Sequence, residues 1–411
     1  MTRRPPAPLF ALLLGLVTGP AAAGTEEFST FDVILQEADD ESLLDHLLTR
    51  TPRAWRDEWE RSPQALRTSQ GCLTSGQWLI GTELKLRAPL GERARFGLDV
   101  RDDQSDRVSL TYLDFSFRFP TGHGTPGFWF RPLYDKSRQD LGLFWEAGTE
   151  TSEVRARATF TLEDVFNNLW EFRQSRVGDA SEPYVKHPFE PAAWLLVRRP
   201  GWRLALEGQY LTPSRKRHGR DTLITHTTLW GALGRSSLEA RLLGIDWSVA
   251  GEGRQARSVG PGTTPPLQVA DFRRQWSVEI AAGRALGPRL EAEARWLYQS
   301  RDQDVTSADR LYLPLVFLDA IDRVVQLEAR FVIAGGWSAR AGGLYDRVTV
   351  AKSAAYFPTH GTRTESRAYV GLSARFGSVV MSAVEGIELD PEPYEVWWIH
   401  DKAFVHLQAT F

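Results

Sequence analysis

The sequence predicts an all-β fold, an antiparallel transmembrane β-barrel of about 16–18 strands preceded by a short helical N-terminal segment. Three observations lead there. Apolar and polar residues alternate in long stretches from Trp78 to the last residue, Phe411. No run of about 18 apolar residues follows the N-terminus, so helices are not expected to cross a bilayer. Tight turns alternate along the chain with long polar connections.

The N-terminus has the layout of a secretory signal peptide. Arg3 and Arg4 precede a short apolar run from Leu9 to Val17, and the small residues Ala21, Ala22 and Ala23 follow it. The run is too short to span a bilayer, although an ordinary N-terminal anchor is the alternative reading. We therefore expect a signal peptide over 1–23 and export of the chain that starts near Gly24.

Residues 24–75 contain the one convincing helical stretch. Leucines at 43, 44, 47 and 48 share one helix face, and Pro52 marks the start of a further short helix that carries Trp55 and Trp59. We expect a periplasmic helical segment here, acting as a plug or as a partner-contact region. Trp55 and Trp59 are expected to be exposed, which would suit contact with a periplasmic protein.

Residues 76–411 are predicted to form the barrel. Residues 154–161 (VRARATFT) and 366–376 (SRAYVGLSARF) illustrate the period of two that marks a strand with one apolar and one polar face. Strands are expected to start near 78, 94, 107, 128, 140, 153, 192, 202, 222, 237, 274, 288, 323, 337, 366, 378 and 402. That count is odd, whereas bacterial barrels have even numbers. A missed strand in 28–36 or 67–75 would bring the total to 18, which we favour.

The connections and the aromatic residues agree with a membrane barrel rather than a soluble sandwich. Tight turns are expected at Pro200-Gly201, Gly234-Arg235, Ala334–Gly336 and Gly377-Ser378, and long polar loops near 163–191, 249–273, 300–322, 350–364 and 389–400. Short periplasmic turns and long external loops are typical of outer-membrane barrels. Aromatic side chains gather at strand ends, where the headgroup regions lie; they include Trp78, Trp145, Trp194, Trp202, Trp276, Trp296, Trp337, Tyr345 and Phe376.

The last residues, HDKAFVHLQATF, form an alternating strand that ends on an aromatic residue. This ending resembles the outer-membrane β-barrel proteins of Gram-negative bacteria, with Phe404 on the polar face as a small departure. The resemblance implies a place in the cell outer membrane and contact with outer-membrane lipid and lipopolysaccharide. It also implies that the barrel-assembly machinery reads the terminal strand, through Val405, Leu407, Ala409 and Phe411.

A barrel of this width usually encloses an aqueous lumen. Charges on the polar strand faces are placed in that lumen because they would be costly against lipid. We expect a channel of porin type for small polar solutes, with a weak anion preference. The expected pore-lining residues are Arg155, Arg157, Arg203, Glu207, Arg241, Glu291, Glu293, Arg295, Glu328, Arg330, Arg340, Arg367 and Arg375. Pairing of opposite charges across strands is the competing interpretation.

Two external features have more than one interpretation. The loop 163–191 is polar and aromatic, and it either narrows the channel or lies on the surface. A basic cluster of Arg215, Lys216, Arg217 and Arg220 is a candidate contact for lipopolysaccharide phosphates, or else a solvated charge run.

Other function classes are weighed against the channel. The first alternative is a component of an outer-membrane secretion or polymer-export system with an occluded lumen. The second is a barrel lipid hydrolase or acyl-transferase, for which His226 is the best candidate, although no nucleophile motif accompanies it. The balance of 49 basic and 52 acidic residues does not indicate nucleic acid binding, and no metal-ligand spacing or cofactor motif is found.

Overall fold

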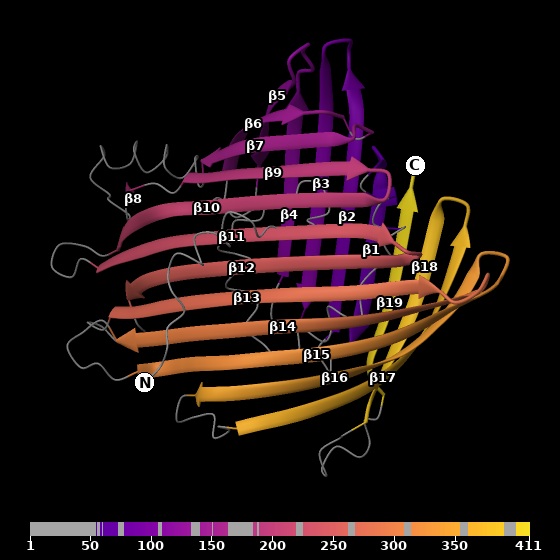
Figure 1. Ribbon diagram of the computed structural model, residues 1–411. Helices are drawn as coiled ribbons and strands as arrows, with labels where there is room; N and C mark the ends of the chain where they lie inside the picture. Colours follow the sequence, from indigo (N-terminus) through magenta and orange to yellow (C-terminus); the bar gives the residue numbers. More distant parts are fainter. Residues whose placement is uncertain are drawn as a thin grey trace.

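A computed structural model of the chain shows one antiparallel sheet that closes on itself (Figure 1). The structure describes residues 55, 58, 59, 61–72, 78–105, 109–132, 140–149, 151–162, 184–186, 189–218, 225–261, 268–307, 314–353, 361–389 and 400–411. The predicted signal peptide lies outside them. None of the described helical residues belongs to a helix long and apolar enough to cross a membrane.

Nineteen strands are formed. They are β1 (Ala65–Cys72), β2 (Trp78–Leu90), β3 (Ala94–Ser105), β4 (Ser109–Arg118), β5 (Thr125–Arg131), β6 (Asp140–Ala147), β7 (Val154–Leu162), β8 (Tyr184–Lys186), β9 (Phe189–Arg199), β10 (Trp202–His218), β11 (Thr225–Leu242), β12 (Ile245–Pro261), β13 (Gln268–Ala285), β14 (Leu290–Ser307), β15 (Pro314–Ala334), β16 (Trp337–Ser353), β17 (Gly361–Phe376), β18 (Val379–Glu388) and β19 (His400–Thr410). The three-residue β8 and the longer β9 both pair with β10, so they share one position in the wall. Eighteen positions therefore surround the barrel.

The first strand closes the barrel. β1 pairs with β2 on one side and with the last strand, β19, on the other. It is the strand expected near 67–75 to make the count even, and it starts at Ala65, ahead of the predicted barrel boundary at residue 76. The other expected position, 28–36, lies outside the described residues. An even count places both ends of the barrel on one side, the side of the tight turns.

Strand lengths differ strongly around the barrel. β5, β6 and β7 have 7–9 residues, whereas β10 to β17 have 16–21. In Figure 1 the long strands run side by side across the front and form one extended wall. Much of the predicted loops 249–273, 300–322 and 350–364 is therefore strand, and those loop assignments are corrected. Alternation stops there because a hairpin that extends beyond the bilayer has water on both sides, while its backbone pairing continues.

One predicted turn is wrong. Gly234 lies within β11, opposite Gly208 of β10 and Gly253 of β12, and the chain reverses instead at Leu243-Gly244. Both turn residues have positive φ angles, 54° and 73°. A two-residue turn of this kind matches the twist of the flanking strands. Leucine rarely adopts such a conformation, which is why the sequence gives no turn signal there.

The outer face carries an apolar band bordered by aromatic side chains. Trp202 and Tyr210 of β10 are exposed and eight positions apart, and so are Trp337 and Tyr345 of β16. On a strand tilted by about 45° and rising about 3.3 Å per residue, that spacing spans about 19 Å of height. Trp194 does not belong to a girdle, because it faces inward beneath the guanidinium of Arg155.

Candidate functional site

The inner wall of the barrel carries most of the buried polar side chains. In β7, Arg155, Arg157, Thr159 and Thr161 are buried, and the residues between them are more exposed. The outer face of a single barrel is open everywhere, so buried side chains identify the inner face. The sequence places these charges in the same way, on the face opposite the apolar set.

An arginine–carboxylate network covers the inner face of β2 to β7. The Arg87 guanidinium lies 2.8 Å from Asp99, and the Arg118 Nε atom donates to Glu146 at 3.2 Å. Arg157 approaches the other carboxylate oxygen of Glu146 at 3.5 Å. The Phe144 ring lies beneath both Arg118 and Arg157, with centroid distances of 5.4 and 4.1 Å. The arginines are thereby held in fixed positions along the wall.

The most buried pair of this network joins β4 and β5. Arg131 donates from Nε and Nη2 to the two carboxylate oxygens of Asp114, at 2.7 and 2.8 Å. Asp140 of β6 lies 3.5 Å from the same guanidinium. The Arg131 side chain also covers the Trp129 ring. Two parallel hydrogen bonds fix the geometry as well as the charge.

This pair allows a stability prediction. Asp114→Ala removes both of these hydrogen bonds from the buried Arg131. We expect the free energy of unfolding to fall by about 3 kcal/mol, since breaking a buried pair costs about 3–5 kcal/mol. The measurement is the urea midpoint of the detergent-solubilised barrel. The double replacement Asp114→Leu/Arg131→Met should recover most of the loss, and a double variant no better than the single one would contradict this account.

A second network lies on the long wall. The Tyr369 hydroxyl accepts a hydrogen bond from Gln326 Nε2 at 2.7 Å and donates to Glu328 Oε2 at 2.8 Å. Arg295 reaches Gln326 at 2.8 Å and Glu279 at 3.2 Å. Arg340 lies 3.7 Å from Glu328. Side chains from the four strands β13 to β16, together with the Tyr369 side chain of β17, thus form one continuous polar network.

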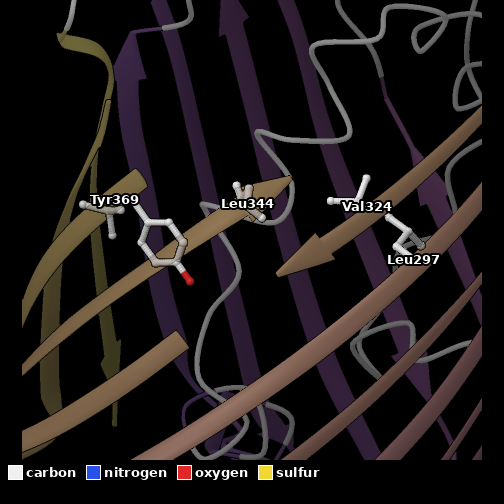
Figure 2. Close-up of a cluster of buried hydrophobic side chains, with 5 residues drawn as sticks. Leu297, Val324, Leu344 and Tyr369 are labelled. Carbon is white, nitrogen blue, oxygen red and sulfur yellow. The ribbon is translucent and has the colours of Figure 1, made fainter. Parts of the chain in front are cut away.

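Beside this polar network lies an apolar patch on the same inner face. Leu297, Val324, Leu344, Tyr369 and Val384 come from consecutive strands and pack as one buried cluster; Figure 2 shows four of them in line along the wall. The Tyr369 ring crosses Gly342 of β16, where an added Cβ would stand 2.4 Å from the ring. A side chain at Gly342 would therefore displace Tyr369 from the cluster.

The predicted pore-lining residues do not form one group. Arg203 and Glu207 lie buried on β10, and Arg367 lies buried on β17. Glu291, Glu293 and Arg330 are more open, while Arg241 is 65% exposed at the turn, 3.9 Å from Asp246. Opposite charges pair across strands in both networks, as the competing interpretation expects. The carboxylate of Asp140 is a partner that the predicted set leaves out.

The N-terminal residues contact the inner wall near the tight turns. We call Trp55, Glu58, Trp59 and Ser62 the docked segment. The Trp59 carbonyl accepts from Lys85 Nζ at 2.5 Å, and its ring lies beneath Arg67 at 4.7 Å. Only 4% of Trp59 is exposed. It is thus buried against β1 and β2, contrary to the expectation of an exposed side chain.

Trp55 and Glu58 anchor the docked segment to the strands β17 and β19. The Trp55 carbonyl accepts from Gln408 Nε2 at 2.8 Å, and its buried ring stacks on His406 at 6.2 Å. Glu58 accepts two hydrogen bonds from Arg375, at 2.8 and 3.2 Å, and one from Thr410 Oγ1 at 3.3 Å. The hydrogen bonds and positive charge of Arg375 hold the pKa of Glu58 below its ordinary value, against a smaller opposing effect of burial.

Other candidate chemistry is limited in the described part of the chain. His406 Nδ1 lies 2.8 Å from Ser69 Oγ, but the Trp55 ring covers the imidazole. The described residues contain no group of three or more His, Cys, Asp or Glu side chains able to hold a metal ion. The side chains of His226, Arg215, Lys216 and Arg217, and the whole of Arg220, lie outside the description.

A closed antiparallel barrel of eighteen strand positions, with an apolar outer band and charged residues facing inward, is an outer-membrane β-barrel. Its location is the cell outer membrane. No family model and no curated protein matches the chain.

Some solved structures are similar to this chain at a low level. A bacterial polysaccharide outer membrane secretin is 10% identical, with a TM-score of 0.43, and the match covers 85% of this chain and 99% of the other. CdiB from Acinetobacter baumannii is 11% identical at a TM-score of 0.42, covering 85% and 60%. Pseudomonas aeruginosa OccK10 is 13% identical at 0.38, covering 85% and 98%. Likeness of this size gives no information on activity.

The C-terminal strand provides a test of assembly. Val405 and Phe411 are exposed on the outer face, and the Phe411 amide donates to Gln64 at 2.9 Å beside the β1–β19 closure. We expect deletion of Phe411 to reduce the amount of heat-modifiable barrel recovered from outer-membrane fractions. Leu243→Asn, which keeps the two-residue turn and changes only an exposed side chain, is the control. Equal recovery of both variants would contradict a role for the terminal residue in assembly.

Proposed function

We propose that this chain is an outer-membrane channel of porin type for small polar solutes, with a weak preference for anions. The observation that carries the proposal is the inner wall, where charged and hydroxyl side chains occupy every second position along strands such as β7. A barrel of this strand number leaves room for an aqueous path. Fixed arginines beside a water-filled path attract anions.

The docked segment refines this proposal. It occupies the inner wall at the tight-turn end, which is the periplasmic end in barrels of this class. Solutes would pass along the part of the wall that the segment leaves open, past Arg155, Arg157 and Arg203. The docked segment would then limit the width of the periplasmic mouth.

Ion selectivity tests the channel. We expect the refolded protein in a planar bilayer to conduct steadily, with a reversal potential that shows mild anion preference under a salt gradient. Arg155→Gln/Arg157→Gln should shift the reversal potential toward cations. Arg199→Gln, which removes an exposed arginine at the rim, is the matched control and should leave it unchanged. Identical reversal potentials in all three proteins would contradict a selective role for β7.

A component of an export system is the second candidate. The buried contacts of Trp55 and Trp59 favour it, because they hold a piece of chain inside the barrel where a free channel needs none. Absence of current from a folded barrel, both as wild type and with Trp55 and Trp59 replaced, would support the export function over the channel. Contact of residues 24–75 with a periplasmic protein belongs to this second proposal.

A further inference from the structure

Two arginines stand side by side on the outer face of the long wall. Arg323 of β15 lies directly opposite Arg347 of β16 in the strand register. Both occupy outward positions, since they alternate with the buried Asp322, Val324, Asp346 and Val348. Arg347 is itself exposed. These are positive charges on a surface that otherwise faces lipid.

The pair lies at one edge of the apolar band. Arg347 is ten positions beyond Trp337, which places it about 23 Å above that girdle on a strand tilted by about 45°. The apolar band of such barrels is about 25 Å tall. The arginines are thus on the side of the long connections, which faces the cell exterior. An arginine costs little at this depth, whereas it would be costly at the midplane.

The arginine pair is not neutralised by the barrel itself. Within the described residues no carboxylate forms an ion pair with either guanidinium, and Arg323 covers the Tyr298 ring at 5.8 Å. Arg323 lies opposite Tyr298 in the register of β14 and β15, and Asp302, four positions further along β14, pairs with Arg274 at 2.7 Å. Like charges directly opposite each other destabilise a strand pair. An anion bound between the two guanidinium groups would remove that repulsion.

The surroundings indicate what kind of anion fits. Hydroxyl groups border the pair on β16 and β17, since Thr364 lies opposite Arg347, and the Thr349 and Thr362 hydroxyls are 3.5 Å apart. On the other side lie the exposed apolar side chains Leu327 and Val370. A ligand with an anionic, hydroxyl-rich head and hydrocarbon chains would meet complementary groups at both ends.

We propose that Arg323 and Arg347 bind the phosphate of an acylated phosphoglycolipid of the outer leaflet, the chemistry of lipopolysaccharide. The acyl chains lie along the apolar band, and the hydroxyl groups of β16 and β17 contact the sugar. This surface is separate from the 215–220 cluster and does not depend on whether the lumen conducts.

The test is native mass spectrometry of the detergent-solubilised barrel titrated with purified lipopolysaccharide. Each basic residue near an anionic lipid surface contributes roughly a fivefold factor in affinity, so Arg323→Ala/Arg347→Ala should bind about 30-fold more weakly. Arg284→Ala is the matched control, because Arg284 is an exposed arginine on the same face at the tight-turn edge. It should bind as the wild type does. Heat-modifiable migration establishes that each variant is folded.

Two outcomes would overturn the proposal. Equal lipopolysaccharide binding by the double variant and by Arg284→Ala would show that the pair is not the site. Full displacement of the lipid by millimolar inorganic phosphate would show that the pair recognises free phosphate, without a contribution from acyl chains or sugar. Retained binding by Arg323→Lys/Arg347→Lys, at reduced affinity, is expected because lysine keeps the charge and loses the bidentate geometry.

Discussion

Replacing Trp55 and Trp59 together by alanine is expected to raise the single-channel conductance of the barrel. Both rings are buried on the inner wall, against His406 and against Arg67 and Lys85. Truncating a buried tryptophan removes about 3–5 kcal/mol of packing. A loss of that size twice over is enough to turn a mostly docked segment into a mostly released one.

The measurement compares open-channel current in planar bilayers at one salt concentration. Trp202→Ala is the control, because that side chain is exposed on the lipid side at the same end of the barrel. We expect its current to equal that of the wild type. If Trp55→Ala/Trp59→Ala folds and conducts no more than Trp202→Ala does, the docked segment does not limit the mouth. Blocking of the enlarged current by an added peptide spanning residues 50–64 would strengthen the argument.

The course of most strands could be predicted from the alternation of apolar and polar residues. Where that prediction fails, the failure has a physical cause. β1 was only one of two places expected for a missing strand because its outward residues Leu66, Thr68 and Gln70 include just one apolar side chain. The halves of β12 to β16 that lie away from the tight turns extend beyond the bilayer. They have water on both sides and lose the period of two. In each case backbone pairing with a neighbour determines the strand, and a single sequence does not contain that pairing.

The inner wall shows a similar limit. Alternation assigns Arg155 and Arg157 to the inner face, but it cannot say that Glu146 of β6 pairs with Arg157 and Arg118. The placement of Trp55 depends on Gln408 and His406, which lie some 350 positions away in the sequence. Amphipathic helical patterns indicate that a face must be covered, and they do not identify what covers it.

Acidification is expected to release the docked segment through Glu58. The carboxylate lies on the N-terminal segment and accepts hydrogen bonds from Arg375 of β17 and from Thr410 of β19. These contacts lower its pKa in the docked state from the ordinary value of 4.5. A lowered pKa means that the ionised form favours docking, so docking is strongest above pH 4.5 and weakens as pH falls toward the lowered value.

Conductance measured as a function of pH tests this linkage. The wild type should conduct more as the pH is lowered below 4.5. Glu58→Gln lacks the titrating group. Its conductance should already be raised at neutral pH and should respond less to pH. Glu58→Arg should open the mouth further, because it faces Arg375 with a like charge. The exchange Glu58→Arg/Arg375→Glu restores an opposite pair and should return the neutral-pH current toward the wild-type level. A swap that remains as open as Glu58→Arg would show that the Glu58–Arg375 ion pair does not hold the segment, and that the tryptophan contacts alone do so.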